Sequence, residues 1–171
     1  MTTTDTTAPT ITSFTTTTAA GSYTVGEAIY ITAVTDETIQ YGNEITVTLN
    51  NSTNTNTVIL SAQTNGTTMV GIYTVASGDT TSGAGLAVLS FSIDTNPPTD
   101  DAGNVMTSIT VPSSSHMFPG ITIIIDTTAP TFSRITAIET ITRNDVNENS
   151  STRACSIDFE FEIDDNTTTL N

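Results

Sequence analysis

The sequence predicts an all-β protein, and three observations lead to this fold class. Threonine occupies 41 of the 171 positions, and a β-branched residue that carries a hydroxyl suits the solvent side of a sheet. Apolar and polar residues alternate in several short runs, which is typical of half-buried strands. Turn signals separate those runs at spacings of roughly 8–15 residues, the pattern of a two-sheet antiparallel β-sandwich.

The individual strands follow from these signals. The segment 27–34 is expected to be a strand that presents Ile29, Ile31 and Ala33 on one face and ends at Asp36-Glu37. The sequence Asn65-Gly66 marks a tight hairpin turn. The expected strands are, in order, one that contains Ile11 and Phe14, and those over 27–34, 45–49, 58–60, 69–75, 89–93, 105–111 and 121–125. We therefore expect residues 1–125 to complete one sandwich domain.

A hexapeptide occurs twice and sets the domain organisation. Asp5-Thr6-Thr7-Ala8-Pro9-Thr10 returns 121 positions later as Asp126-Thr127-Thr128-Ala129-Pro130-Thr131. That offset suits one β-sandwich domain and is too long for a solenoid repeat. Threonine favours extended backbone, and proline keeps the preceding alanine out of the helical region. The hexapeptide is therefore interpreted as a short, stiff joint between domains.

Residues 126–171 are expected to form a second, incomplete β unit. A strand over 131–141 is followed by a polar loop over 143–152 and by a strand over 155–163 in which apolar and acidic residues alternate strictly. Two strands do not make a closed sandwich. Two interpretations follow: the segment contains the first strands of a second repeat, or it is a hairpin that exchanges strands with another copy.

The charge distribution excludes several partners. The net charge is −15, and the cations Arg134, Arg143 and Arg153 all lie after residue 125. Such a surface repels nucleic acid and anionic membranes, so no nucleic-acid partner is expected. No apolar run approaches the roughly 18 residues of a membrane span. The carboxylates of residues 1–125 therefore need counter-ions from solution, and a divalent cation is the obvious candidate.

Several motifs in a fixed order point to a family. They are Asp5-Thr6-Thr7-Ala8-Pro9, the segment Tyr23-x-x-Gly26-Glu27-x-Ile29-x-Ile31-Thr32, the run from Tyr73 to Asp79, the loop Asp101-Ala102-Gly103-Asn104, and the second joint at Asp126. Over about residues 5–130 the chain resembles the bacterial immunoglobulin-like, cadherin-like repeats of large cell-surface adhesins. The resemblance implies an immunoglobulin-like antiparallel β-sandwich, an extracellular location at the cell surface, and calcium sites near domain junctions. The second repeat departs from the pattern, because it has Arg143-Asn144-Asp145-Val146 where the Tyr-x-x-Gly-Glu element belongs.

Calcium is the cofactor that the residues themselves favour. Ca²⁺ takes six to eight oxygen ligands, many of them carboxylates. Acidic side chains stand at both joints, Glu27, Asp36 and Glu37 flank the 27–34 strand, and Gly103 lets the 100–104 loop curl so that carbonyls also point inward. This loop is expected to lie near the terminal joint. The expected ligands are Asp5, Glu27, Asp36, Asp100, Asp101, Asn104 and Asp126. The alternative is that these residues only form turns.

Enzymatic catalysis has little support in the sequence. The chain has a single histidine, His116, which lies in a predicted loop, and a single cysteine, Cys155, which begins an apolar strand face and is interpreted as a buried thiol. With one of each, neither a zinc site nor a nucleophile–base pair is expected.

We therefore expect a non-enzymatic extracellular structural or adhesive module, one repeat of a calcium-stiffened surface rod. Its partners would be neighbouring immunoglobulin-like domains or identical subunits, with a host or surface receptor as a further candidate. The alternative is a filament subunit that polymerises by β-strand addition through residues 131–164, because an amphipathic hairpin without a partner sheet can add to a neighbour's sheet edge.

Overall fold

The computed structural model describes residues 4–51, 56–112, 120–138 and 158–164, and side chains are described outside 132–138 and 158–164. The chain divides into two compact units, Met1–Thr127 and Thr128–Asn171. The described residues form ten β-strands and no helix, so the predicted all-β class is confirmed. Among these residues there is accordingly no helix of the length and apolar character that a membrane crossing requires.

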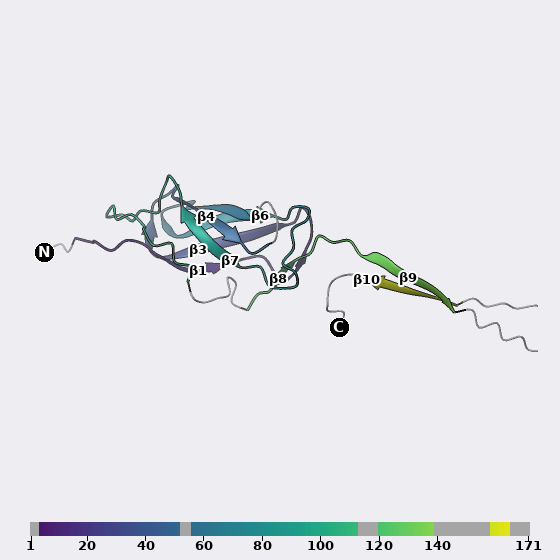
Figure 1. Cartoon of the computed structure of the whole chain (residues 1–171). Coiled ribbons are helices and arrows are strands. Elements are labelled where there is room, and N and C mark those ends of the chain that lie inside the picture. The colour runs from purple at the N-terminus through teal and green to yellow at the C-terminus, as the bar shows by residue number, and fades with distance from the viewer. Residues whose placement is uncertain (1–3, 52–55, 113–119, 139–157, 165–171) are drawn as a thin grey trace, which may run out of the picture. The chain divides into compact units, whose positions relative to one another are not determined.

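Unit 1 is built on a six-stranded antiparallel sheet that nearly closes into a barrel (Figure 1). Phe14 on one edge strand and Phe91 on the other meet edge to face, with ring centroids 5.9 Å apart, so the two edges of the sheet share one interior. The strands, in their order across the sheet, are β1 (Ile11–Thr15), β3 (Ala28–Ile39), β6 (Gly66–Thr74), β5 (Thr57–Ser61), β4 (Glu44–Leu49) and β7 (Val88–Ile93).

The core follows the period-2 alternation of the strands. Inward-facing side chains on β3 are fully buried, as the sequence predicts for Ile29, Ile31 and Ala33. Ile45, Val47 and Leu49 on β4 are also 0% exposed and complete the same interior. Three of the four outward positions between them are threonine, which keeps β propensity while facing water.

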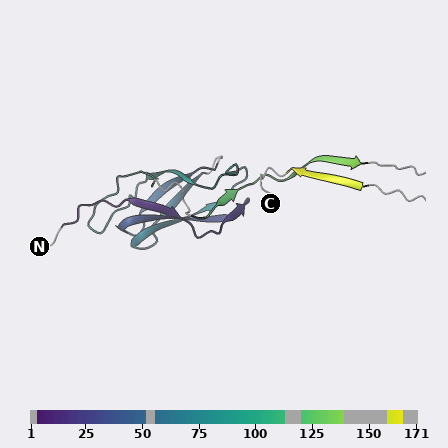
Figure 2. The same cartoon turned by 90° about the horizontal axis from the view of Figure 1, so that it is seen from below.

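A short parallel pair completes unit 1. β2 (Gly21–Tyr23) pairs with β8 (Ile123–Ile125), and Ile123 and Ile125 are fully buried. In both views the chain enters unit 1 at one end and leaves from β8 at the opposite end (Figures 1 and 2). Neither hexapeptide lies within the six-stranded sheet; the first precedes β1 and the second follows β8.

Three local expectations differ from the structure. β3 continues through Asp36-Glu37 to Ile39, because Ile39 is buried and bridges to Asp100. The alternation of residues 89–93 predicts that Leu89 shares a face with Phe91, but the β4–β7 register shifts between Thr48 and Leu49, and Leu89 is 61% exposed. The expected strand over 105–111 is absent apart from a single bridge between Val105 and Thr99.

Unit 2 repeats a pairing irregularity of unit 1. It contains β9 (Thr131–Ile138) and β10 (Asp158–Asp164), an antiparallel pair whose register shifts so that Ser133 has no partner. In unit 1 the β1–β3 register shifts in the same way, and the residue without a partner there is Thr12. Ser133 follows Thr12 by 121 positions, which is the offset between the two hexapeptides. The sequence repeat is thus also a repeat of backbone structure.

Candidate cation site

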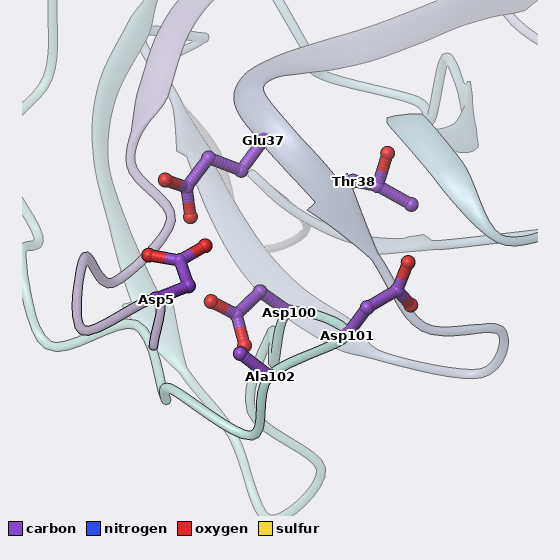
Figure 3. A pocket seen from close by; sticks show the side chains of 6 residues that line it. All are labelled: Asp5, Glu37, Thr38, Asp100, Asp101 and Ala102. Carbon is purple, nitrogen blue, oxygen red and sulfur yellow. The ribbon is translucent and has the colours of Figure 1, made fainter. Parts of the chain in front are cut away.

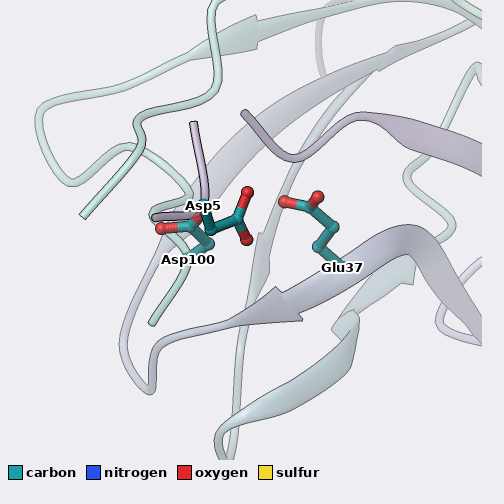
Figure 4. Close-up of side chains that lie close together, drawn as sticks. All are labelled: Asp5, Glu37 and Asp100. Atoms are coloured by element: carbon teal, nitrogen blue, oxygen red, sulfur yellow. The ribbon is translucent and has the colours of Figure 1, made fainter. Parts of the chain in front are cut away.

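Three carboxylates from distant parts of the sequence converge at the N-terminal end of unit 1. Asp5 belongs to the segment before β1, Glu37 lies near the C-terminal end of β3, and Asp100 belongs to the loop after β7. One carboxylate oxygen of each lies within 4.8 Å of the others. Figure 4 shows the carboxylates of Asp5 and Glu37 facing each other, with Asp100 beside Asp5.

Local hydrogen bonds hold the Asp5 segment against the domain. The Asp5 Oδ1 atom accepts a hydrogen bond from the backbone N–H of Thr7 at 3.0 Å. The Asn104 side-chain amide donates to the Asp5 carbonyl at 3.3 Å. Further along, Asp36 accepts hydrogen bonds from the Thr10 N–H at 2.6 Å and from the Thr10 hydroxyl at 2.7 Å. Asp36 therefore fastens the joint to β3, and its carboxylate is occupied by Thr10.

Asp100 is held ionised by its own loop. Its side chain is only 3% exposed, and Asn104 donates to it twice, from the backbone N–H at 2.7 Å and from the side-chain amide at 2.7 Å. Gly103 has a φ of +91°, which glycine adopts without strain and which lets the loop turn back on Asp100. Burial opposes ionisation, but the hydrogen bonds from Asn104, Ala102 and Gly103 outweigh it and lower the pKa of Asp100.

The surroundings of Glu37 disfavour its ionised form, whereas those of Asp100 favour it. Its Oε2 atom is buried and has no hydrogen-bond donor among the described residues. Burial, followed by the negative charges of Asp5, Asp36 and Asp100, raises the pKa of Glu37 above its ordinary value. A carboxylate in this position is stabilised by a proton or by a cation, and residues 1–125 contain no lysine or arginine to supply the charge.

The three carboxylates line a pocket of about 560 Å³ together with Thr38, Asp101 and Ala102 (Figure 3). In Figure 3 the carboxylate of Asp101 is directed to the side of Thr38 and away from the other three acids. The pocket therefore offers oxygen ligands almost exclusively, the donor set that hard cations such as Ca²⁺ and Mg²⁺ prefer.

The structure brings together part of the predicted ligand set. Asp5 and Asp100 lie in the cluster, Asn104 braces both of them, and Asp101 lines the pocket. Glu27 and Asp126 lie elsewhere. Glu27 accepts a hydrogen bond from the Thr24 N–H at 2.6 Å within a turn.

Asp126 is at the exit end of unit 1, where it bridges to Thr80 and its N–H donates to the Tyr23 carbonyl at 3.0 Å. The 100–104 loop thus meets the first joint, at Asp5, and Asp126 belongs to a separate place in the fold.

The predicted ligand set leaves out Glu37, which supplies the third carboxylate of the cluster. The signal for it was in the sequence. Ile29, Ile31 and Ala33 define the inward face of β3, and continuing that period-2 alternation places Glu37 on the inward side and Asp36 on the outward side. A strand that ends at Asp36-Glu37, as expected from the sequence, assigns neither acid to a face of the sheet.

A second polar cluster is buried near the exit of unit 1 and is fully internal. Tyr73, Asn51 and Asp79 are 2%, 3% and 0% exposed. The Tyr73 hydroxyl donates to Asp79 and accepts from the Asn51 amide at 2.7 Å, and the Ala76 N–H donates to Asp79 at 2.8 Å. The Asp79 carbonyl accepts from the Thr127 hydroxyl at 2.9 Å. This cluster ties the chain exit to the core.

His116 and Cys155 lie outside the described residues, as does the 143–152 loop. No protein-family model matches the chain, and neither a curated protein nor a solved structure shows significant similarity to it.

Proposed function

We propose that this chain is a non-enzymatic extracellular module of a surface rod, an immunoglobulin-like repeat whose N-terminal joint is stiffened by calcium. The observation that carries the proposal is the Asp5–Glu37–Asp100 cluster, whose ligand oxygens lie within 4.8 Å of one another. Asp5 belongs to the joint, whereas Glu37 and Asp100 belong to the folded domain. A cation bound by all three would therefore fix the direction in which the chain enters the domain.

Charge balance supports a cation rather than a purely structural role for the cluster. Three carboxylates at this separation repel one another, and the nearby Asp36 adds to the charge on Glu37. The buried Glu37 Oε2 atom lacks a donor among the described residues, so it is a free ligand position. Calcium suits the site better than magnesium, because Ca²⁺ accepts irregular sets of six to eight oxygens and water can complete them.

The partial exposure of the site favours a low affinity for calcium. Asp5 is exposed and Glu37 is half-buried, so water competes for the ion. Sites of extracellular modules bind calcium with dissociation constants of about 10⁻⁴ to 10⁻³ M. A site in this range would be filled by extracellular calcium and would stay empty at cytosolic concentrations, as the proposed cell-surface location requires.

The repeated backbone irregularity supports the proposal that the module is one of a series. Thr12 and Ser133 occupy equivalent unpaired positions in β1 and β9, and each follows a copy of the same hexapeptide. In both units the residue after proline also pairs at the same point: Thr10 accepts from the Asp36 N–H at 3.1 Å, and Thr131 pairs with Asp164. Unit 2 thus begins as unit 1 does.

Calcium titration of the full chain tests the proposed function. Because a ligand that binds only the folded state stabilises it by about 2.7 kcal/mol at 100 times its dissociation constant, saturating calcium should raise Tm by roughly 5–10 °C over the protein in EGTA. The double variant Asp5→Asn/Asp100→Asn should lose most of this increase. The control Glu27→Gln should keep it. An unchanged Tm after complete removal of divalent cations would reject the calcium site.

The filament alternative rests on a different observation. β9 and β10 form a two-stranded sheet of their own, in the order β10-β9, so each has an outer edge with no strand beside it among the described residues. Electron microscopy of the purified chain separates the two functions, since strand addition through residues 131–164 predicts fibres and a rod module predicts single particles.

A further inference from the structure

The loop between β5 and β6 ends in a dipeptide whose chemistry the calcium function does not use. Asn65 is the last residue of this loop, and Gly66 is the first residue of β6. Asn65-Gly66 is the one place in the 171 residues where glycine follows asparagine. Gln63, Thr64 and Asn65 are consecutive exposed residues, so water reaches the Asn65 carboxamide.

The fold does not require glycine at position 66. The φ of Gly66 lies outside the left-handed region, and a β-carbon at this position would meet nothing nearer than the Thr64 hydroxyl oxygen, at 4.0 Å. What the missing side chain does provide is freedom of rotation and an unhindered backbone nitrogen directly after an asparagine. That nitrogen and the Asn65 carboxamide carbon are close enough along the chain to close a five-membered ring.

A backbone donor already holds the Asn65 carboxamide. The Tyr41 N–H, in the turn between β3 and β4, donates a hydrogen bond to Asn65 Oδ1 at 2.8 Å. Oδ1 is the atom that becomes negatively charged when a nucleophile adds to the carboxamide carbon. Fixed N–H donors at about 2.7–3.1 Å from such an oxygen lower the barrier to its attack. The Tyr41 N–H is therefore placed as an oxyanion donor.

We propose that Asn65-Gly66 is a site of spontaneous covalent modification, at which the Gly66 nitrogen attacks Asn65 and the Tyr41 N–H stabilises the oxyanion. The Gly66 N–H loses its proton to base in solution, and the nitrogen forms a bond to Asn65 Cγ while the C=O electron pair moves to Oδ1. As that pair returns, the Cγ–Nδ2 bond breaks, and Nδ2 takes a proton from solvent and leaves as ammonia. Water then opens the succinimide ring to aspartate or isoaspartate.

Both products change the beginning of β6. Aspartate retains an acceptor for the Tyr41 N–H but adds a carboxylate to residues 1–125, which contain no lysine or arginine. Isoaspartate adds a methylene group to the backbone just before Gly66, which pairs with Ile39, the buried last residue of β3. The isoaspartate form should therefore weaken the β3–β6 pairing at this point. This inference does not depend on the calcium site.

Incubation of the full chain in EGTA at mildly alkaline pH tests the proposal, because base removes the Gly66 proton. Chromatography and mass spectrometry of peptides that span residues 61–69 measure aspartate, isoaspartate and succinimide at Asn65 over time. We expect Asn65 to convert before Asn43, Asn96 and Asn104, which are followed by glutamate, proline and valine and serve as references in the same sample.

Gly66→Ala tests the attacking nitrogen. The methyl group hinders the nitrogen and restricts the backbone, so conversion should slow at least about tenfold, which corresponds to a barrier higher by about 1.4 kcal/mol. Because the added carbon meets open space, circular dichroism and Tm should stay those of the wild type.

Two substitutions of Tyr41 isolate its N–H. Tyr41 is the second residue of a turn in which the Asn43 N–H donates to the Gln40 carbonyl at 3.3 Å. Gly42 has a φ of +79° and Tyr41 a negative φ, so the turn is of type II, which commonly has proline in the second position. Tyr41→Pro therefore removes the donor and retains the turn. Tyr41→Ala removes the same exposed side chain and keeps the donor.

Conversion at Asn65 should slow at least about tenfold in Tyr41→Pro and keep the wild-type rate in Tyr41→Ala. The proposal is wrong if Asn65 does not convert ahead of the reference asparagines, or if Gly66→Ala converts as fast as the wild type. Equal rates in the two Tyr41 variants, or a faster rate in Tyr41→Pro, would show that the Tyr41 N–H only anchors the side chain, which overturns its assignment as the oxyanion donor.

Discussion

Glu37 differs from the other acids of the candidate cation site in the environment of its carboxylate. Asp36 and Asp100 each accept several hydrogen bonds from their own surroundings, and the pKa of each is lowered. Glu37 is in the opposite position, because a buried oxygen without a donor and three neighbouring carboxylates raise its pKa. Of these three acids, Glu37 is therefore the one that most readily takes up a proton.

The cation-free protein should accordingly become more stable on mild acidification. A raised folded-state pKa gives stability that is present at low pH and lost as pH rises through that pKa, so the contribution of Glu37 grows as pH falls toward its ordinary value of 4.5. Below the ordinary aspartate value of 3.8, protonation of Asp36 and Asp100 removes stability instead. In EGTA, Tm should therefore pass through a maximum between these regions.

The variant Glu37→Gln isolates this effect. At about pH 7 in EGTA it should have a higher Tm than the wild type, and this difference should shrink as pH falls toward the ordinary glutamate value of 4.5. With excess calcium the order reverses, because the variant lacks a ligand and the wild type holds the ion. Differential scanning calorimetry across pH measures both, with Glu27→Gln as the control. A wild-type profile that the Glu37 substitution leaves unchanged would contradict the assignment.

The hydroxyl group of Tyr73 should contribute more to the free energy of unfolding than the hydroxyl group of an exposed tyrosine does. Burial and its hydrogen bond to Asp79 raise the pKa of Tyr73, so its hydroxyl remains a donor at all working pH values. Tyr73→Phe leaves the buried Asn51 amide and one acceptor site of Asp79 without this partner. We expect a loss of about 1–3 kcal/mol in the free energy of unfolding, measured by urea denaturation. Tyr41→Phe, at a position 72% exposed, should change it by less than about 0.5 kcal/mol.

At the scale of single elements, β5 and β6 pack closely at Gly71. A β-carbon at this position would lie 2.3 Å from the Ile59 carbonyl oxygen and 2.6 Å from Leu60 Cδ2. Since the carbonyl belongs to the backbone of β5, it moves only if the strand moves. Glycine therefore permits the close packing of these two strands inside the curled sheet.

Gly71→Ala should destabilise unit 1 by about 3 kcal/mol, because the added methyl group forces β5 away from β6. Gly83→Ala serves as a contrasting variant: there an added β-carbon meets nothing within 4 Å, and only its φ of +79° opposes the substitution. Urea denaturation of both variants measures the difference. An equal or smaller loss at Gly71 would show that the strands separate without cost.

The sequence predicted those strands whose two faces differ strongly. β3, β4, β5 and β6 alternate buried and exposed side chains, and the sequence predicts each of them, although the predicted β3 ends five residues too early. The sequence does not predict β2, because three residues are too few to show an alternation of apolar and polar side chains. β2 is defined by its parallel pairing with β8. Leu89 was placed on the wrong face because a register shift depends on the partner strand and leaves no local signal.

The candidate site was predictable in its residue types and only partly in its members. Asp5 and Asp100 were identified by their places in the joint and in a glycine-containing loop. Which joint meets the loop depends on the ends of the sheet at which β1 begins and β7 stops, and this is a property of the topology. Glu37 required the exact end of β3, and strand ends are the least predictable part of a strand.

At the scale of the whole molecule, the absence of lysine and arginine from residues 1–125 makes stability depend on ionic strength. Residues 1–125 contain nine acids and no lysine or arginine, so ions from solution reduce the repulsion among these acids. In EGTA, raising NaCl from about 0.05 to 0.5 M should increase Tm by several degrees, since the Debye length shortens over this range. With saturating calcium the increase should be smaller. A Tm that falls with salt in EGTA would contradict this account.

The parallel pairing of β2 with β8 has a mechanical consequence. When unit 1 is pulled by its two ends, tension passes through β1 before it reaches β2 from the N-terminal side, and it reaches β8 from the C-terminal side. Because the strands are parallel, those forces slide one strand along the other, and the hydrogen bonds that join Gly21–Tyr23 to Ile123–Ile125 share the load instead of opening one by one. The three residues of β8, two of them fully buried, thus resist extraction from the C-terminal end of unit 1 until the β2–β8 hydrogen bonds shear.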